Sequence, residues 1–254
     1  MNNIHGIKDS ANITILEKVS KKPFLYADYA TSVSNNWKTS QVYAKSKSTK
    51  AIRWDFGKES TLKMHLEIFD MRFISMLAGS EFKKGKQNLF KREVLVADNK
   101  NSITLSHEAK VGSLSVHLLQ EDGLTNGDEI KLGDNSSSGN YKVDTSESKK
   151  LLLNTTQCPE GTKIVVYYMT NTEETAQTMT ISADKFPKAY TIYMDTMIRD
   201  TDQQDKFVQV HYLNVKPKGN FTLTMSASDI TKLEIEFDVL KDSGSEDMMT
   251  YTII

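Results

Sequence analysis

Hydrophobic side chains recur at every second position in several segments of this chain, and this spacing constrains the fold more than any other feature of the sequence. In residues 61–68 the apolar residues are Leu62, Met64, Leu66 and Ile68, with polar residues between them. Successive side chains of a β-strand point to opposite faces, so the pattern predicts a strand with one buried face. The C-terminal third repeats the pattern in residues 192–198, 208–212, 221–227 and 233–239. Because one-sided alternation is typical of antiparallel sheets, we expect an all-β fold.

One short helix is predicted directly after the strand of residues 61–68. Asp70 is a candidate N-cap, and Gly79 is a candidate stop because glycine readily adopts the left-handed conformation that ends many helices. The residues between them are almost all apolar. We therefore expect this helix to be buried against the sheet, where it serves packing and not ligand binding.

The length of 254 residues allows one large β domain or two smaller ones. Charged stretches at residues 79–88 and 184–188 contain Gly or Pro and are candidate joints. About seven short β segments lie between them, enough for a small Ig-like sandwich. We expect a discontinuous domain of residues 1–87 and 185–254 that carries residues 88–184 as an inserted sandwich. One continuous large sandwich is the alternative.

No set of catalytic residues can be assembled from the sequence. The five histidines form no HExxH motif and no metal-like spacing with Cys158, the single cysteine, and no glycine-rich phosphate loop is present. With 32 basic and 33 acidic residues, the chain lacks the basic excess of a dedicated duplex-DNA binder. The sequence predicts a protein that is not an enzyme and uses no cofactor.

No segment suggests a membrane or a secretory route. The longest apolar runs are far shorter than the about 20 residues that span a bilayer. The N-terminal residues lack the charged start and the continuous apolar core of a signal peptide. We expect the protein to stay in the cytoplasm unless an assembly carries it elsewhere.

One acidic cluster raises the question of a metal site. Asp200, Asp202 and Asp205 are spaced so that their carboxylates could bind calcium through oxygen ligands. The cluster lacks the glycine and the distal glutamate of an EF-hand loop, and it lies between two predicted strands. A polar hairpin turn is therefore the favoured interpretation, with a cation site as the alternative.

A second acidic cluster lies along a predicted strand. Glu234, Glu236 and Asp238 alternate with apolar residues and share one strand face. Acid–base catalysis needs carboxylates in contrasting environments, which a row on one solvated face does not supply. We interpret the row as a solvated acidic face.

Basic and aromatic residues interleave in residues 38–54. Proteins that bind single-stranded nucleic acid use such mixtures for base stacking and for contacts to phosphates. A loop or an edge strand that lysines protect against aggregation explains the mixture as well, and we favour it.

Two blocks of the chain resemble the major tail (tube) proteins of tailed bacteriophages. Residues 57–79, GKESTLKMHLEIFDMRFISMLAG, carry a turn, a strand and a short apolar helix closed by glycine. Residues 186–240 carry a strand, an acidic turn, a strand, the connection KPKGN and two further strands. The middle of the chain, with TLSHEAKVGSLSVHLL and GTKIVVYY, is similar to the sandwich insertion of some relatives.

This resemblance implies a structural virion protein with an antiparallel β-sandwich or barrel and one packed helix. Its copies are expected to form hexameric rings that stack into a tail tube, through which the genome passes without specific binding. The implied location is the virion tail, assembled in the cytoplasm of the bacterial host. Further implied partners are the tape-measure, tail terminator, baseplate and sheath proteins.

The resemblance also gives roles to two sets of residues. Glu234, Glu236 and Asp238 are expected to face the lumen and to repel phosphates. The N-terminus and a mobile loop at residues 35–50 are expected to order against neighbouring rings. The candidate residues of that loop are Asn35, Trp37, Lys38, Tyr43, Lys45, Lys47 and Lys50.

A competing function is a β-sandwich binding module for carbohydrate or for a surface receptor, on a virion or a cell surface. Such a module needs exposed aromatic side chains that converge with polar groups. The candidates in the predicted insertion are Tyr141, Tyr167 and Tyr168, for which a place in the strand core is the other interpretation.

Overall fold

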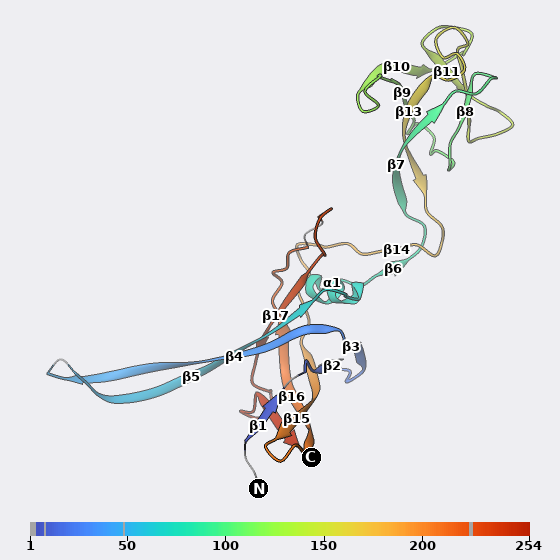
Figure 1. Cartoon of the computed structure of the whole chain (residues 1–254). Helices are drawn as coiled ribbons and strands as arrows, with labels where there is room; N and C mark the ends of the chain where they lie inside the picture. Colours follow the sequence, from blue (N-terminus) through green and yellow to red (C-terminus); the bar gives the residue numbers. More distant parts are fainter. Residues whose placement is uncertain (1–3, 8, 48, 224–225) are drawn as a thin grey trace. The chain divides into compact units, whose positions relative to one another are not determined.

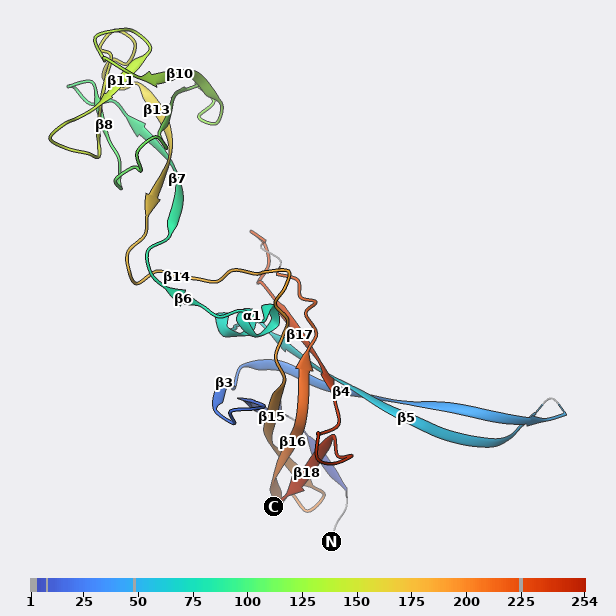
Figure 2. The same cartoon turned by 180° about the vertical axis from the view of Figure 1, so that it is seen from behind.

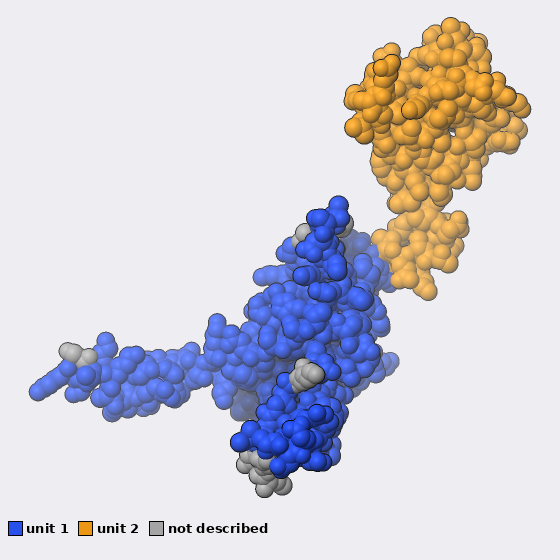
Figure 3. Space-filling view, in the orientation of Figure 1, with its two compact units in different colours: residues 1–82, 179–254 blue, residues 83–178 orange. Residues whose placement is uncertain are grey.

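The computed structural model describes residues 4–7, 9–47, 49–223 and 226–254. The chain forms two compact units, coloured separately in Figure 3: unit 1 comprises residues 1–82 and 179–254, and unit 2 comprises residues 83–178. In the described part of the chain, strands dominate and only one helix occurs, which confirms the predicted all-β class. Nearly all strand pairs are antiparallel.

Unit 1 is built on a nine-stranded antiparallel sheet in the described residues. Its strands are β1 (His5–Ile7), β2 (Asn12–Glu17), β3 (Pro23–Ala27), β4 (Ala30–Ser46), β5 (Thr49–Leu66), β15 (Tyr190–Asp200), β16 (Asp205–Pro217), β17 (Leu233–Val239) and β18 (Met249–Ile253). They lie in the order β3-β2-β15-β16-β17-β5-β4, with β1 paired to β15 and β18 paired to β16 (Figures 1 and 2). Segments from both ends of the chain therefore share one sheet.

The core of unit 1 lies between one face of this sheet and the helix α1 (Met71–Ala78). Alternating burial along the strands forms this core. On β17, Leu233, Ile235 and Phe237 have no exposed surface, while the residues between them reach solvent. Phe73 and Met76 of α1 join the same apolar cluster. The buried side chains of the strands and the apolar side chains of the helix thus form one core, as the sequence predicts.

The helix begins and ends at the predicted residues. Asp70 caps its N-terminus by accepting a hydrogen bond from the backbone N–H of Arg72 at 2.8 Å. Gly79 ends it with a φ of 64°. A Cβ at residue 79 would also collide with the backbone carbonyl of Phe186, so both the conformation and the space require glycine there.

The prediction of a loop at residues 35–50 is wrong, because this segment forms a long β-hairpin. Strand β4 runs through residue 46 and pairs with β5, and Lys47 is the one described residue between them outside a strand. Two register shifts, at Thr39/Ser40 and Ala44/Lys45, interrupt the alternation along the hairpin. These shifts hide the strand pattern from a search for strict period two.

The prediction of a strand at residues 221–227 is also wrong, because the described residues of that segment form no strand. Met225 lies outside the described residues. Strand β16 already pairs with β15 on one edge and with β17 and β18 on the other. No edge of β16 is left for the segment that follows it. Phe221 instead packs against the core as a partly buried side chain.

Unit 2 contains a seven-stranded sheet and a separate two-stranded pair. The sheet is formed by β7 (Asn88–Val96), β8 (Ser102–Thr104), β9 (Ser115–Leu119), β10 (Asn126–Leu132), β11 (Asn140–Val143), β12 (Lys150–Leu153) and β13 (Lys163–Asn171), and the pair by β6 (Lys83–Lys84) and β14 (Gln177–Thr178). The sheet order is β7-β13-β9-β10-β11-β12-β8, and only β10 and β11 are parallel.

The core of unit 2 follows from the same alternation. On β13, Ile164, Val166 and Tyr168 point inward and have no exposed surface. Cys158 is also buried in this core, and burial raises the pKa of its thiol. The thiol is therefore a packing group and not an activated nucleophile.

Replacing Phe73 by alanine should lower the free energy of unfolding of unit 1 by about 3–5 kcal/mol, because the ring is fully buried and leaves a cavity. The matched change Met71→Ala on the same helix should cost less than about 0.5 kcal/mol, since Met71 is 53% exposed. Both tryptophans lie in unit 1, so urea unfolding followed by tryptophan fluorescence reports on it. Equal losses in the two variants would contradict the packing described for α1.

Candidate functional site

The hairpin formed by β4 and β5 extends beyond the sheet of unit 1. Strand β17 pairs with β5 only from Ser60 to Leu66. Farther out, the two strands pair with each other alone, as Figure 1 shows for the labelled strands β4 and β5. Two-stranded hairpins are marginally stable in water by themselves. The outer hairpin is therefore a segment that a further partner would stabilise.

A bulge at Gly57 changes which face of the hairpin is apolar. Thr39 lies opposite Lys58 and Ser40 lies opposite Phe56, so Gly57 is the extra residue, and its φ is 62°. Beyond the bulge, the pairs Phe56–Ser40, Trp54–Val42 and Ile52–Ala44 share one face. We call the side chains of Val42, Ile52, Trp54 and Phe56 the apolar hairpin face; each is between 51% and 57% exposed.

The opposite face of the outer hairpin is polar. Arg53 forms an ion pair with Asp55 at 2.8 Å, and the hydroxyl of Tyr43 donates a hydrogen bond to Gln41 at 2.5 Å. The ammonium group of Lys50 lies 4.0 Å from the centre of the Tyr43 ring. The hairpin is thus amphipathic, with one solvated face and one apolar face that no described residue covers.

A buried polar network fixes the root of the hairpin to the sheet. The side-chain amide of Asn35 donates to the hydroxyl of Tyr212 at 3.0 Å, and the hydroxyl of Ser60 donates to the amide oxygen of Asn35 at 2.6 Å. Tyr212 has no exposed surface, and burial strongly raises the pKa of its phenol. Because buried polar groups are costly when unpaired, this network holds β4 in one register on the core.

The outer face of β17 carries paired charges instead of a row of free carboxylates. Lys63 of β5 contacts Glu236 and lies 3.3 Å from Glu234. Lys218 lies 3.1 Å from Glu236 and 3.5 Å from Asp238. The sequence places the three acids on one face correctly, but it does not reveal that two lysines from neighbouring segments bridge them.

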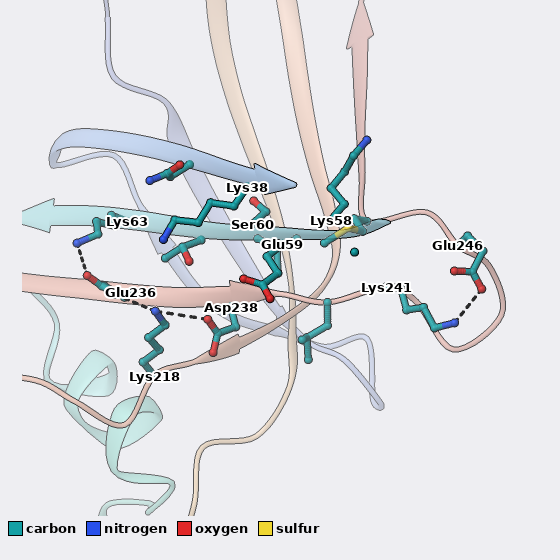
Figure 4. Close-up of a pocket in the computed structure, with 16 residues that line it drawn as sticks. Lys38, Lys58, Glu59, Ser60, Lys63, Lys218, Glu236, Asp238, Lys241 and Glu246 are labelled. Atoms are coloured by element: carbon teal, nitrogen blue, oxygen red, sulfur yellow. Dashed lines mark hydrogen bonds and ion pairs between the residues drawn. The ribbon is translucent and has the colours of Figure 1, made fainter. Parts of the chain in front are cut away.

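Lys63, Lys218, Glu236 and Asp238 line an open groove of about 1160 Å³ in unit 1, and Glu234 lies beside it. Figure 4 shows Lys63, Glu236, Lys218 and Asp238 joined in one chain of ion pairs along it. We call this set, together with Glu234, the charged groove. Further along the groove, Lys241 pairs with Glu246 at 2.8 Å.

The pairing shifts the pKa values of the groove. The hydrogen bond from Lys63, and then the one from Lys218, lower the pKa of Glu236. The same contact with Glu236 raises the pKa of Lys218 and of Lys63. These groups therefore stay ionised near neutral pH, and the groove offers both signs of charge at close range.

The acidic cluster of residues 200–205 forms the predicted hairpin turn between β15 and β16. A carboxylate oxygen of Asp200 accepts hydrogen bonds from the backbone N–H groups of Asp202 and Gln204 at 3.0 and 2.9 Å. Arg199 forms two hydrogen bonds with Asp205 at 2.6 and 2.7 Å. In the described part of the chain, no group of His, Cys, Asp and Glu is arranged to hold a metal ion, so the geometry does not favour the calcium alternative.

The residues proposed for ring-to-ring contact occupy different parts of the hairpin. Asn35 belongs to the buried root network, and Trp37 is 38% exposed beside it. Lys38 lines the charged groove, and Tyr43 lies on the polar face. Lys45, Lys47 and Lys50 lie at the outer end.

Sequence reasoning missed the apolar hairpin face, although Ile52, Trp54 and Phe56 alternate in the sequence. That short alternation was the available signal, and the surrounding lysines obscured it.

Among the described residues, no helix has the length and apolar character needed to cross a bilayer.

The chain matches known proteins along most of its length. The model of the YomU/Tube protein family matches residues 5–254. The tail tube protein of Bacillus phage SPR is 24% identical over 195 residues, which cover 75% of this chain and 66% of that protein, just under two thirds of its length. Both matches confirm the resemblance to phage tail tube proteins that the sequence suggested.

Replacing Glu236 by glutamine should reduce the loss of stability of unit 1 in acid. A carboxylate whose pKa is lowered by folding stabilises the fold above its ordinary value of 4.5, and this contribution disappears as the pH falls through the lower folded value. At neutral pH the variant should have a lower free energy of unfolding than the unchanged protein. Between about pH 7 and about pH 3 its free energy of unfolding should then fall by less.

The matched control is Glu59→Gln, because Glu59 lines the same groove and forms no ion pair with any described residue. Urea unfolding at both pH values measures the difference. An unchanged acid dependence in Glu236→Gln would show that the ion pairs of the groove do not stabilise the fold.

Proposed function

This chain belongs to the YomU/Tube protein family, and from this premise we propose that it is a structural subunit whose copies form hexameric rings that stack into a phage tail tube. The tube is the conduit for genome delivery. The family match points to a non-enzymatic role. The place of action is the virion tail, after assembly in the cytoplasm of the bacterial host.

The apolar hairpin face is the observation that carries this proposal. It combines two aromatic and two aliphatic side chains, each about half exposed, on a hairpin that leaves the sheet. Large apolar patches on soluble proteins mark interaction sites, and burying the exposed half of such side chains is worth about 1 kcal/mol each. A copy of the same chain is the partner that a tube subunit always has beside it.

The contact between copies joins two different surfaces. The hairpin of one subunit would lie on a surface of the next that is not the hairpin itself, which is a heterologous contact. Heterologous contacts close into rings when the rotation allows it and otherwise propagate. A tube needs both, with lateral closure within a ring and axial repetition between rings. Open sheet edges at β3 and β4 supply further places for pairing with neighbours.

The charged groove suits a wall of the conduit. Five lysines and four carboxylates line it, and with Glu234 beside it the two signs balance. A positive wall would hold the phosphates of a passing genome. A wall in which both signs balance neither binds the polyanion nor repels it strongly. We therefore assign Glu234, Glu236 and Asp238 to the lumen.

Other tail proteins would bind the ends and the surfaces of such a tube. The partners are the tape-measure protein within it, the terminator and baseplate proteins at its ends, and a sheath protein where the tail contracts. We also propose that unit 2 is a separate Ig-like domain inserted into the tube-forming unit.

The double change Trp54→Ala with Phe56→Ala should abolish tubes and leave the fold intact, because both side chains are about half exposed. Negative-stain electron microscopy and sedimentation velocity would show rings or single subunits instead of tubes. The control is Arg53→Ala with Asp55→Ala on the polar face of the same strand, which should still form tubes. Tubes of normal length in the aromatic variant would exclude the apolar hairpin face as the contact between copies.

A cysteine at residue 234 should react as a luminal group in assembled tubes. A small maleimide would label Glu234→Cys in the intact tube, whereas a maleimide on a bulky polymer would label it only after disassembly. Background labelling is low because Cys158 is buried. Val111→Cys, which is fully exposed in unit 2, is the control that both reagents should label. Fast labelling of residue 234 by the bulky reagent would place it outside the lumen.

A further inference from the structure

The outward face of the sheet in unit 2 has its own packed layer. On β13, Val165 points away from the core yet has no exposed surface. Its cross-strand neighbours on that face are Val94 of β7 and His117 of β9. These neighbours cover Val165 completely, although Val94 itself remains 43% exposed.

Aromatic and polar side chains lie together on this outward face of the sheet. The rings of Phe90 and Tyr167 lie 6.1 Å apart and within 20° of parallel, and the His117 ring meets Tyr167 edge-on at 6.3 Å. The guanidinium of Arg92 lies 5.9 Å from the Tyr167 ring. We call the side chains of Phe90, Arg92, His117, Asn126 and Tyr167 the aromatic platform; they come from the neighbouring strands β7, β9, β10 and β13 (Figure 1).

Hydrogen bonds hold the platform in one arrangement. The hydroxyl of Tyr167 donates to Asn126 at 2.9 Å and accepts from Nε of Arg92 at 3.4 Å. This contact with Arg92 lowers the pKa of Tyr167. No described residue accepts a hydrogen bond from the remaining guanidinium nitrogens of Arg92. The platform thus presents flat rings beside polar groups with donor capacity to spare, and it needs little ordering when a ligand binds.

The other two tyrosines considered for such a site are core residues. Tyr141 and Tyr168 are 3% and 0% exposed and belong to the core of unit 2. The hydroxyl of Tyr168 donates to Glu93 at 2.6 Å. Tyr167 alone among the three points outward, so the platform depends on it.

The charge of unit 2 limits the class of ligand. Residues 83–178 contain twelve Lys and Arg residues and thirteen Asp and Glu residues. A surface that binds a nucleic acid or an anionic polysaccharide needs a positive excess, because phosphate or carboxylate neutralisation dominates the affinity. An uncharged ligand with both apolar faces and hydroxyl groups fits the platform instead.

We propose that the aromatic platform of unit 2 binds neutral carbohydrate. A pyranose ring places its C–H groups over one flat face, where the Phe90 ring, 60% exposed and stacked on Tyr167, receives them, and it places its hydroxyl groups at its edge. There Arg92, His117 and Asn126 supply donors and acceptors. Unit 2 would give the particle an adhesive function that is separate from the tube and does not depend on how unit 1 assembles.

A protein partner fits the platform less well. A standard protein interface brings about 20–30 residues from each side, whereas the platform comprises five side chains with polar groups between its rings. Val94 and Val96 extend an exposed apolar row along β7. Self-association through this row is the rival outcome that the experiment must detect.

The test applies the full-length protein to an array of neutral and anionic oligosaccharides, and then titrates the best neutral binder. Phe90→Ala and Tyr167→Ala should each weaken that binding about tenfold, as expected for the loss of a stacking ring. Tyr167→Phe, which keeps the ring and removes the hydroxyl, should lose less. Leu89→Ala is the matched control, because Leu89 is 42% exposed on the opposite face of the same strand.

Three results would overturn the proposal. One is an array on which no neutral glycan is retained above the level of the double variant Phe90→Ala with Tyr167→Ala. Another is retention restricted to anionic glycans. The third is self-association, measured by sedimentation, that Phe90→Ala abolishes while glycan retention is unchanged. Thermal melting of each variant separates a lost site from a lost fold.

Discussion

Strand β5 carries apolar side chains to two opposite faces along its length, and the assembly that we propose depends on that change of face. From Leu62 to Leu66 its apolar residues enter the core of unit 1, whereas Trp54 and Phe56 lie on the other face, beyond the bulge at Gly57. One subunit cannot bury both sets, because no described strand lies beside the outer hairpin. Burying the exposed half of each aromatic ring against a neighbouring copy would contribute about 1 kcal/mol in each subunit of the proposed assembly.

The charges of the charged groove suit the conduit that we propose. A free row of carboxylates would repel a polyanion and would also repel itself, which destabilises the subunit. Pairing with Lys63 and Lys218 removes most of this repulsion and keeps the face hydrated. The wall can then be wet, nearly neutral and stable at once. In the proposed tube, a genome could pass along such a wall without binding to it.

The sequence predicts the elements of the core well and the exposed surfaces of the proposed assembly poorly. Burial on one strand face leaves a period-two record, as in β17, and the caps of α1 are set by Asp70 and Gly79. The hairpin is missed because register shifts break the period, and the strand expected at residues 221–227 fails because the edges of β16 are occupied. Ion pairs such as Lys63–Glu236 join segments far apart in the sequence, so no local pattern reveals them.

The contact between copies through the hairpin is the central claim, and a cryo-electron microscopy reconstruction of the assembled particle tests it most directly. We predict rings of six subunits in which the side chains of Trp54 and Phe56 lie against an adjacent copy and are no longer exposed. A reconstruction in which both rings remain in solvent, while other surfaces join the subunits, would contradict the account.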